Sequence, residues 1–135
     1  MRQALWPEGT VAEHAAEIDT FFRGGRPGEQ VWVAEFAPGE LCGFLELSIR
    51  SYAEGCEPGN VPYVEGWWVD PSLRRCGIGG ALIATVEAWA AASGYDELAS
   101  DTQLDNADSL AAHLALGFEE VERAIHFRKR IEISN

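Results

Sequence analysis

Hydrophobic and polar residues alternate over two neighbouring segments in the first half of the chain. Gln30 to Phe36 reads Q-V-W-V-A-E-F, and Leu41 to Ile49 reads L-C-G-F-L-E-L-S-I, with A-P-G-E between them. A period of two with β-branched and aromatic residues favours strands, and a short turn containing Gly and Pro favours a hairpin. We therefore predict an antiparallel hairpin over residues 30–49.

A third apolar segment, Val61 to Val69, is typical of a buried strand, and Asp70-Pro71 ends it at a turn. A loop rich in glycine follows and leads into a helix. That helix carries Leu82, Ile83, Val86 and Trp89 on one side and ends at Gly94. The pattern thus predicts a strand, a loop and a helix in direct succession.

The remaining segments predict shorter elements. A capping box at Thr10 and Glu13 begins a helix over residues 10–24. A short strand is expected near residues 97–100, a helix from about Asn106 to Leu116, and strand-like sequence in two parts from Phe118 to Ile131. Because strands and helices do not alternate strictly, the expected fold class is α/β, with a mixed, mostly antiparallel central sheet and helices on both faces.

Composition bounds the class of protein. The 135 residues are expected to form one domain, residues 1–135, and a hydrophobic share of 47% fits a globular protein. No apolar run approaches the ~18 residues of a membrane span, and the N-terminus lacks the apolar core of a signal peptide, so we expect a cytoplasmic protein without membrane contact. Three cysteines without metal-ligand spacing predict reduced thiols and no metal site.

Charge narrows the choice of partners. The chain has 22 acidic and 10 basic residues, which gives a net charge of -12. Nucleic acid is disfavoured because its phosphates would be repelled, whereas a small cationic molecule would be attracted. Acidity that serves solubility alone is an equally open explanation.

The Gly-rich loop suggests an anion site. Trp67 to Ala81 reads W-W-V-D-P-S-L-R-R-C-G-I-G-G-A, and the unpaired N–H groups at a helix start can hold a phosphate. A dinucleotide fingerprint fails because its third glycine position is Leu82. A nucleotide P-loop fails because Gly79-Gly80-Ala81 lacks the Gly-Lys-Ser/Thr ending.

The remaining interpretation starts from the motif R-x-x-G-x-G, Arg74 to Gly79, which follows V-D-P. This motif resembles the acetyl-CoA pyrophosphate loop of the GNAT N-acetyltransferase superfamily. The whole chain is similar to the aminoglycoside 6'-N-acetyltransferase branch of that superfamily. The segments that carry this likeness are A-L-W-P, R-S-Y-A-E-G-C, V-E-G-W-W-V-D-P-S-L-R-R, A-S-D-T-Q-L-D-N and A-L-G-F-E-E-V-E-R-A-I-H-F-R-K-R.

The resemblance implies a GNAT-like fold and a homodimer that uses acetyl-CoA as cosubstrate. It implies direct attack by the 6'-amino group of an aminoglycoside on the thioester, an activity linked to antibiotic resistance. The residues implied in acetyl-CoA binding are Trp67, Trp68, Val69, Arg75, Cys76, Gly77, Ile78, Gly79, Gly80 and Asn106. Asn106 is equally well explained as the N-cap of its helix.

Acidic residues are the candidates for binding the acceptor. Glu65 lies in an otherwise apolar strand, where a charge is costly unless it has a partner or a solvent-filled cleft. Asp101 directly follows a short strand, at the end where α/β sheets place ligands. Either carboxylate could hold the cationic amine or accept its proton, and structural pairing is the alternative for both.

Other candidates depend on the resemblance. Trp6 and Tyr52 are expected beside the sugar and Glu122 in the acceptor site, although Trp6 could instead fill the core and Glu122 could be an ordinary solvated charge. His113 stands where most of the superfamily has a tyrosine that protonates the thiolate. A histidine can do this near neutral pH, or it can simply flank the helix.

The chain departs from the family at its start. Members begin with a short strand and most of a first helix before L-W-P, so the first strand is expected to be missing here. We expect a translation start upstream of Met1; the alternative is that a partner subunit or the truncated segment itself covers the sheet edge. Two other functions remain open: a GNAT enzyme for another amine, such as a polyamine, and a non-catalytic module that binds acyl-CoA.

Overall fold

The computed structural model describes Met1 and residues 28–133. The helix predicted over residues 10–24 and the candidate Trp6 lie outside these described residues. The chain forms two compact units, Met1–Asp101 and Thr102–Asn135, each of which is described by itself. In the part that the structure describes, no helix is both long and apolar enough to cross a bilayer.

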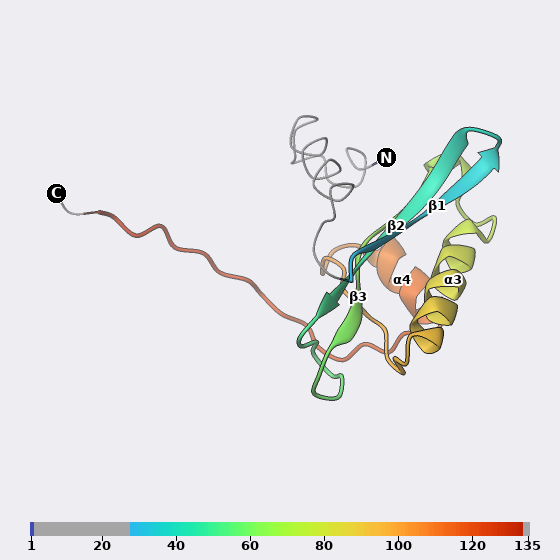
Figure 1. Ribbon diagram of the computed structural model, residues 1–135. Coiled ribbons are helices and arrows are strands. Elements are labelled where there is room, and N and C mark those ends of the chain that lie inside the picture. Colours follow the sequence, from blue (N-terminus) through green and yellow to red (C-terminus); the bar gives the residue numbers. More distant parts are fainter. Residues whose placement is uncertain (2–27, 134–135) are drawn as a thin grey trace. The chain divides into compact units, whose positions relative to one another are not determined.

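The first unit is built on a four-stranded sheet in the order β1-β2-β3-β4 (Figure 1). Its strands are β1 (Gln30–Ala37), β2 (Glu40–Arg50), β3 (Val61–Val69) and β4 (Ala99–Ser100). β2 pairs antiparallel with both β1 and β3, and β4 runs parallel to β3. The predicted hairpin, third strand, short strand and mixed, mostly antiparallel sheet are therefore confirmed.

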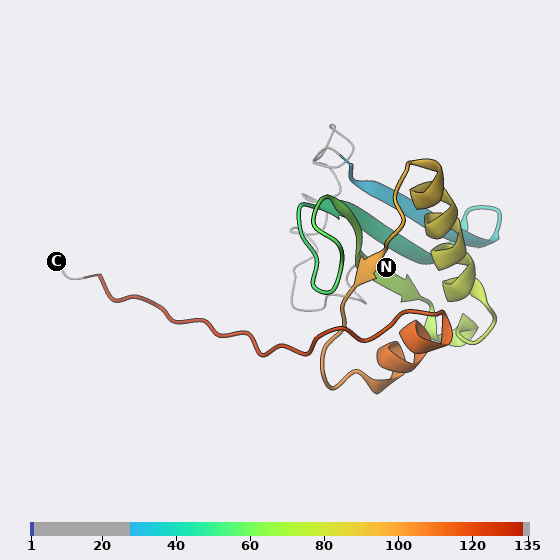
Figure 2. The same ribbon diagram turned by 90° about the horizontal axis from the view of Figure 1, so that it is seen from below.

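One face of the sheet is covered by α3 (Ile78–Ala92), as Figure 2 shows. The ring of Trp32 on β1 meets that of Trp89 on α3 edge-on, with 5.6 Å between the ring centroids. The most deeply buried side chains of the unit include Leu45, Leu47, Ile83 and Val86. The predicted helix and its apolar side are thus confirmed, and Gly94, with φ +89°, supplies the left-handed residue that ends it.

A bulge in β3 changes which side chains share a face. Pairing with β2 passes from Glu46↔Gly66 directly to Leu47↔Val64, so Glu65 is the extra residue of the bulge. Side chains alternate along a strand, and the extra residue shifts that alternation by one. As a result Trp67 points to α3, where its indole donates a hydrogen bond to Gly79, while Glu65 points to the opposite face.

The second unit contains α4 (Ala107–Ala115), which confirms the predicted helix. The Asn106 side chain caps it by accepting a hydrogen bond from the backbone N–H of Ser109 at 3.0 Å. The strand predicted from Phe118 to Ile131 is wrong for this structure, because residues 118–133 contain no strand.

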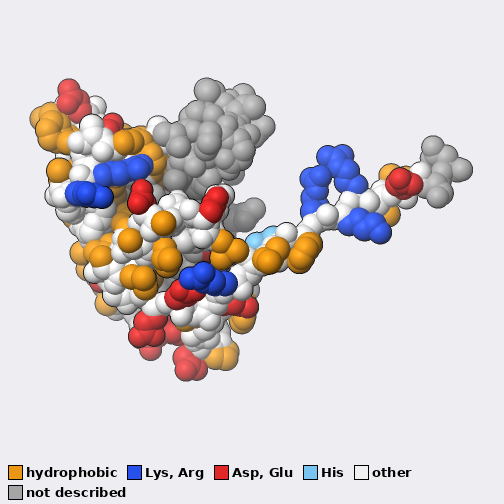
Figure 3. Space-filling view, turned by 180° about the vertical axis from the view of Figure 1, so that it is seen from behind, with side chains coloured by type: hydrophobic (Ala, Val, Ile, Leu, Met, Phe, Trp, Pro, Cys, Tyr) orange, Lys and Arg blue, Asp and Glu red, His pale blue; other side chains and the backbone are white. Residues whose placement is uncertain are grey.

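The physical reason is the absence of a pairing partner. Apolar alternation gives a strand a buried face, but a strand also needs a neighbour for its backbone hydrogen bonds. Among the described residues none pairs with this segment, and its apolar side chains beyond Phe118 are exposed to solvent (Figure 3). Those most exposed are Ile125, Phe127, Ile131 and Ile133.

Candidate functional site

The loop between β3 and α3 is tied back to the end of the strand. Asp70 accepts hydrogen bonds from the backbone N–H of Ser72 at 2.9 Å and from its hydroxyl at 2.7 Å, and these bonds lower the pKa of Asp70. The short 3-10 helix η1 (Pro71–Leu73) follows from this cap. Arg74 then donates from Nε to the Val69 carbonyl at 2.9 Å, which holds the loop against the strand.

Two residues of the loop have left-handed backbones just before α3. Arg75 has φ +66° and Gly77 has φ +84°. Such a conformation costs a non-glycine residue ~1–2 kcal/mol, and strain of this kind gathers at functional sites. Gly77 is the N-cap of α3 and offers no side-chain cap, so the first-turn N–H groups remain available to an anion.

Gly79 has a packing role that the sequence did not reveal. A Cβ atom there would lie 3.1 Å from Cζ2 of Trp67, and Nε1 of that indole donates to the Gly79 carbonyl at 3.2 Å. The glycine therefore lets α3 approach β3 closely. A Cβ atom at Gly77, in contrast, would meet nothing within 4 Å, so Gly77 is the position that faces open space.

On the side away from β2, the far end of β3 has no strand beside it among the described residues. β4 pairs with β3 only at Tyr63↔Ala99 and Val64↔Ser100 within the described chain. The Asp70 N–H donates to the Cys42 carbonyl at 2.7 Å and so points at β2. Because successive backbone groups alternate sides, the Val69 N–H faces away from β2, toward the unpaired edge.

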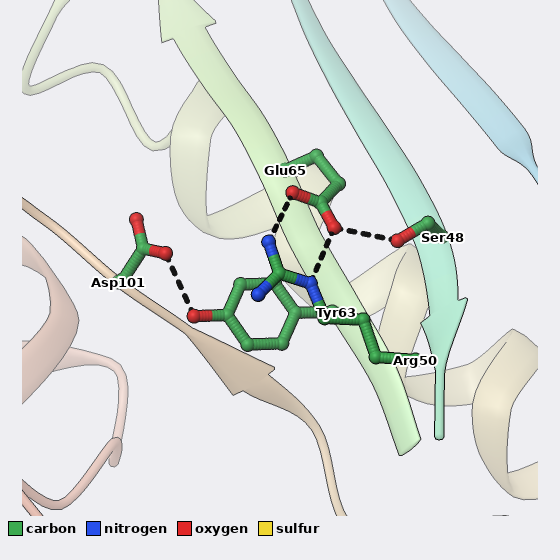
Figure 4. A network of polar contacts seen from close by, with 5 residues as sticks. All are labelled: Ser48, Arg50, Tyr63, Glu65 and Asp101. Atoms are coloured by element: carbon green, nitrogen blue, oxygen red, sulfur yellow. Dashed lines mark hydrogen bonds and ion pairs between the residues drawn. The ribbon is translucent and has the colours of Figure 1, made fainter. Parts of the chain in front are cut away.

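Both predicted carboxylates of the first unit lie in one polar network, drawn in Figure 4. Glu65 accepts two parallel hydrogen bonds from Arg50, from Nε to Oε1 and from Nη2 to Oε2, each 2.8 Å long. Oε1 also accepts from the Ser48 hydroxyl at 2.6 Å. Glu65 thus has the structural partner that a charge in this strand requires.

Asp101 joins the same network through Tyr63. The Tyr63 hydroxyl donates to Asp101 Oδ2 at 2.7 Å, and the Arg50 guanidinium carbon lies 3.6 Å from the centre of the Tyr63 ring. Burial and, to a lesser extent, the bond to Asp101 raise the pKa of Tyr63, so this hydroxyl remains a donor at neutral pH. Two carboxylates and one guanidinium leave the network with a net negative charge.

Sequence reasoning missed the members that link these carboxylates. Ser48 and Arg50 are two apart on β2, as Tyr63 and Glu65 are on β3, and Ser48 pairs directly with Tyr63. Side chains placed in this way share a face of the sheet. Strand alternation around Glu65 could have pointed to Tyr63, whereas Arg50 needed the register between the two strands.

The other candidates have separate environments. Tyr52 is 64% exposed in the loop after β2. In the second unit Asn106 caps α4 and Glu122 is exposed. His113 donates from Nδ1 to the Ser109 carbonyl at 2.7 Å, and its ring packs edge-on against Phe118. This bond places a proton on Nδ1 of His113.

The described residues contain no cluster of three or more His, Cys, Asp or Glu side chains that could hold a metal ion.

Comparisons with known proteins identify the family. The model of the acetyltransferase (GNAT) family matches residues 1–118. The chain belongs to the GNAT acetyltransferase family. The fold, the helix start and the glycine loop described above are thus those of a GNAT protein.

Several relatives of this GNAT protein are similar over nearly the whole chain. An aminoglycoside N(6')-acetyltransferase type 1 from Klebsiella aerogenes is 53% identical over 131 residues, which is 96% of this chain and 86% of the relative. One from Serratia marcescens is 39% identical and covers 97% of this chain and 89% of the relative. The solved structure of AAC(6')-Iy with the bisubstrate analog CoA-S-monomethyl-acetylneamine superposes with a TM-score of 0.86 at 39% identity, covering 97% and 88% of the two chains.

Proposed function

We propose that the protein transfers an acetyl group from acetyl-CoA to the 6'-amino group of aminoglycosides. The observation that carries this proposal is the arrangement of the site: α3 begins without a side-chain cap, and Glu65 and Asp101 share one network on the sheet face opposite to α3. The enzymes at 53% and 39% identity supply the class of acceptor.

The cofactor-binding part fits acetyl-CoA. A diphosphate needs several N–H donors without another acceptor, which the start of α3 provides through residues 77–80. The edge of β3 from Trp67 to Val69, along which β4 does not run, suits the peptide-like pantetheine arm, and Asn106 is a further candidate for contacting it. Acetyl-CoA would supply the thioester on which the amine acts.

Binding and deprotonation of the amine are assigned to the carboxylates. An alkylamine with a pKa near 10 is only about one part in a thousand neutral at pH 7, which costs ~4 kcal/mol. Asp101 would attract the ammonium group and accept its proton, directly or through water. The Val69 N–H, on the unpaired edge, would donate to the oxygen that becomes negative during attack.

The remaining roles belong to the same proposal. His113 would return a proton to the thiolate through Nε2, and Tyr52, Glu122 and Trp6 would contact the sugar. We also propose a single acetyltransferase domain, because the family match crosses the boundary between the two units. A cytoplasmic homodimer is the expected state, and a light-scattering mass of one chain, 14.8 kDa, would overturn the dimer.

Neomycin and paromomycin provide a matched test of the function. They differ at the 6' position, which carries an amine in neomycin and a hydroxyl in paromomycin. We expect release of CoA from acetyl-CoA with neomycin, kanamycin and tobramycin, and none with paromomycin, because attack requires the 6'-amine. Equal turnover of both compounds would contradict the 6' assignment. Turnover of a polyamine but of no aminoglycoside would favour a GNAT enzyme for another amine. Binding of acetyl-CoA without turnover of any amine would favour a non-catalytic module.

A further inference from the structure

The contact between Arg50 and Glu65 is unusually well defined for a partly exposed pair. Two parallel N–H···O bonds of 2.8 Å fix the carboxylate plane, and the third bond, from Ser48, fixes its rotation. A forked contact of this kind constrains geometry as well as charge. The Glu65 carboxylate is therefore held in one orientation on the sheet.

Arg50 also contacts the residue that holds Asp101. Its guanidinium lies over the Tyr63 ring at 3.6 Å, and the Tyr63 hydroxyl donates to Asp101. Arg50 thus contacts both Glu65 and Tyr63, and through them it connects the two carboxylates (Figure 4).

Stability alone does not account for this arrangement. The side chains of Arg50 and Glu65 are 43% and 34% exposed. Ion pairs this accessible contribute only ~0–1 kcal/mol to folding, because solvent and salt screen them. The burial of Leu45, Leu47 and Ile83 already holds the sheet to α3. The contact instead serves to orient its members.

The two carboxylates differ in what they contact. Glu65 faces a full positive charge, which offsets its own. Asp101 meets a neutral hydroxyl and interacts with the Arg50 charge more weakly than Glu65 does, so its negative charge is offset less. A cationic amine that enters the site is therefore attracted more strongly to Asp101.

We propose that Arg50 is a positioning residue of the acceptor site, which holds Glu65 in place and leaves Asp101 as the carboxylate that receives the reacting amine. This inference rests on the proposed function, since it concerns the acceptor of that reaction. Arg50 touches no reacting atom in this account and acts through Glu65 and Tyr63.

A double-mutant cycle tests the proposal. Kinetic constants for neomycin and for acetyl-CoA are measured for the wild type, Arg50→Ala, Glu65→Gln and the double variant. We expect Arg50→Ala to lower kcat about tenfold, because a carboxylate displaced by a fraction of an ångström orients the amine poorly. KM for acetyl-CoA should stay unchanged. The double variant should be no slower than the slower single variant, because Arg50→Ala already disturbs the position of Glu65.

Two further variants separate charge from geometry. Arg50→Lys keeps the charge without the planar fork, so we expect only partial recovery of kcat. Arg123→Ala removes a similar forked contact, with Glu120 in the second unit, and should leave both constants unchanged. Thermal unfolding of each variant shows whether the fold is kept.

Each outcome bears on a distinct claim. A wild-type kcat in Arg50→Ala, full recovery in Arg50→Lys, or losses that multiply in the double variant would overturn the positioning role. A wild type that turns over no aminoglycoside would overturn the proposed function, and this proposal with it. Wild-type turnover with an unaffected Arg50→Ala would overturn the positioning role alone.

Discussion

Tyr63 has the most constrained environment of the residues in the polar network. It is 4% exposed, packs with Ala53 and Val61, and donates a hydrogen bond from its hydroxyl to Asp101. A buried hydroxyl that donates a hydrogen bond to a carboxylate keeps its proton to higher pH than a tyrosine in water does. This accounts for the raised pKa of Tyr63. Its titration can therefore be followed as a pH-dependent change in the free energy of unfolding.

Stability should depend on this hydroxyl in a pH-dependent way. The unfolded chain releases the Tyr63 proton near pH 10, whereas the folded protein holds it to higher pH. The contribution of this hydroxyl to the free energy of unfolding is therefore complete below pH 10. It falls as the pH rises above 10, by up to ~1.4 kcal/mol per pH unit. Tyr63→Phe should lose ~2 kcal/mol in free energy of unfolding at pH 8, and the gap to the wild type should narrow above pH 10.

Urea unfolding at a series of pH values from 8 upward measures this gap. Tyr52→Phe, which alters an exposed tyrosine, is the matched control and should follow the wild type. A gap that stays constant with pH would contradict the raised pKa of Tyr63, and the absence of any gap would show that the bond to Asp101 contributes nothing.

At this scale the sequence predicts which residues carry charge, but not what each one contacts. Glu65 stood out because a carboxylate is costly in an apolar strand, and Asp101 because it follows a strand end. Arg50 has neither property and is distant in sequence from its partner. Only the pairing of β2 with β3 brings the two together.

Among the elements, the link between β3 and α3 positions the site. The bulge at Glu65 turns Trp67 toward α3 and leaves Glu65 on the other face, so one strand serves both the helix and the polar network. Simple alternation would place Tyr63, Glu65 and Trp67 on one face. The strand itself could be predicted from its apolar residues, but the bulge could not, because it arises from the pairing of two strands.

The two glycines at either end of α3 allow a matched test of the loop. Gly77 and Gly94 both have left-handed backbones, and a Cβ atom would meet nothing within 4 Å at either. We expect Gly77→Ala and Gly94→Ala to cost similar stability, ~1–2 kcal/mol. Only Gly77→Ala should raise KM for acetyl-CoA, by about tenfold, since it disturbs donors that face a diphosphate.

Steady-state kinetics with varied acetyl-CoA, together with urea unfolding, check this expectation. An unchanged KM in Gly77→Ala, or an equal rise in both variants, would argue against an anion at the start of α3. Gly79 is less suitable for this test, because a side chain there would press on Trp67 and disturb the packing of the helix.

For the whole molecule, the net charge of -12 fits an acceptor that is a polycation. The order of strands and helices from residue 30 to residue 117 could be predicted, because each element has a clear period and clear ends. Residues 118–131 were predicted as strand because their apolar residues alternate, yet Phe127 is 92% exposed. A strand depends on a partner as well as on its own pattern, and the sequence of the segment does not contain that information.

The central claim is that one chain binds a diphosphate at the start of α3 and an amino sugar at Asp101. A crystal structure with both CoA and neomycin measures this most directly. We predict the CoA diphosphate within hydrogen-bonding distance of the backbone N–H groups of residues 77–80, with the 6'-amine against the Asp101 carboxylate. A diphosphate bound elsewhere, or a 6'-amine turned away from Asp101, would contradict the account.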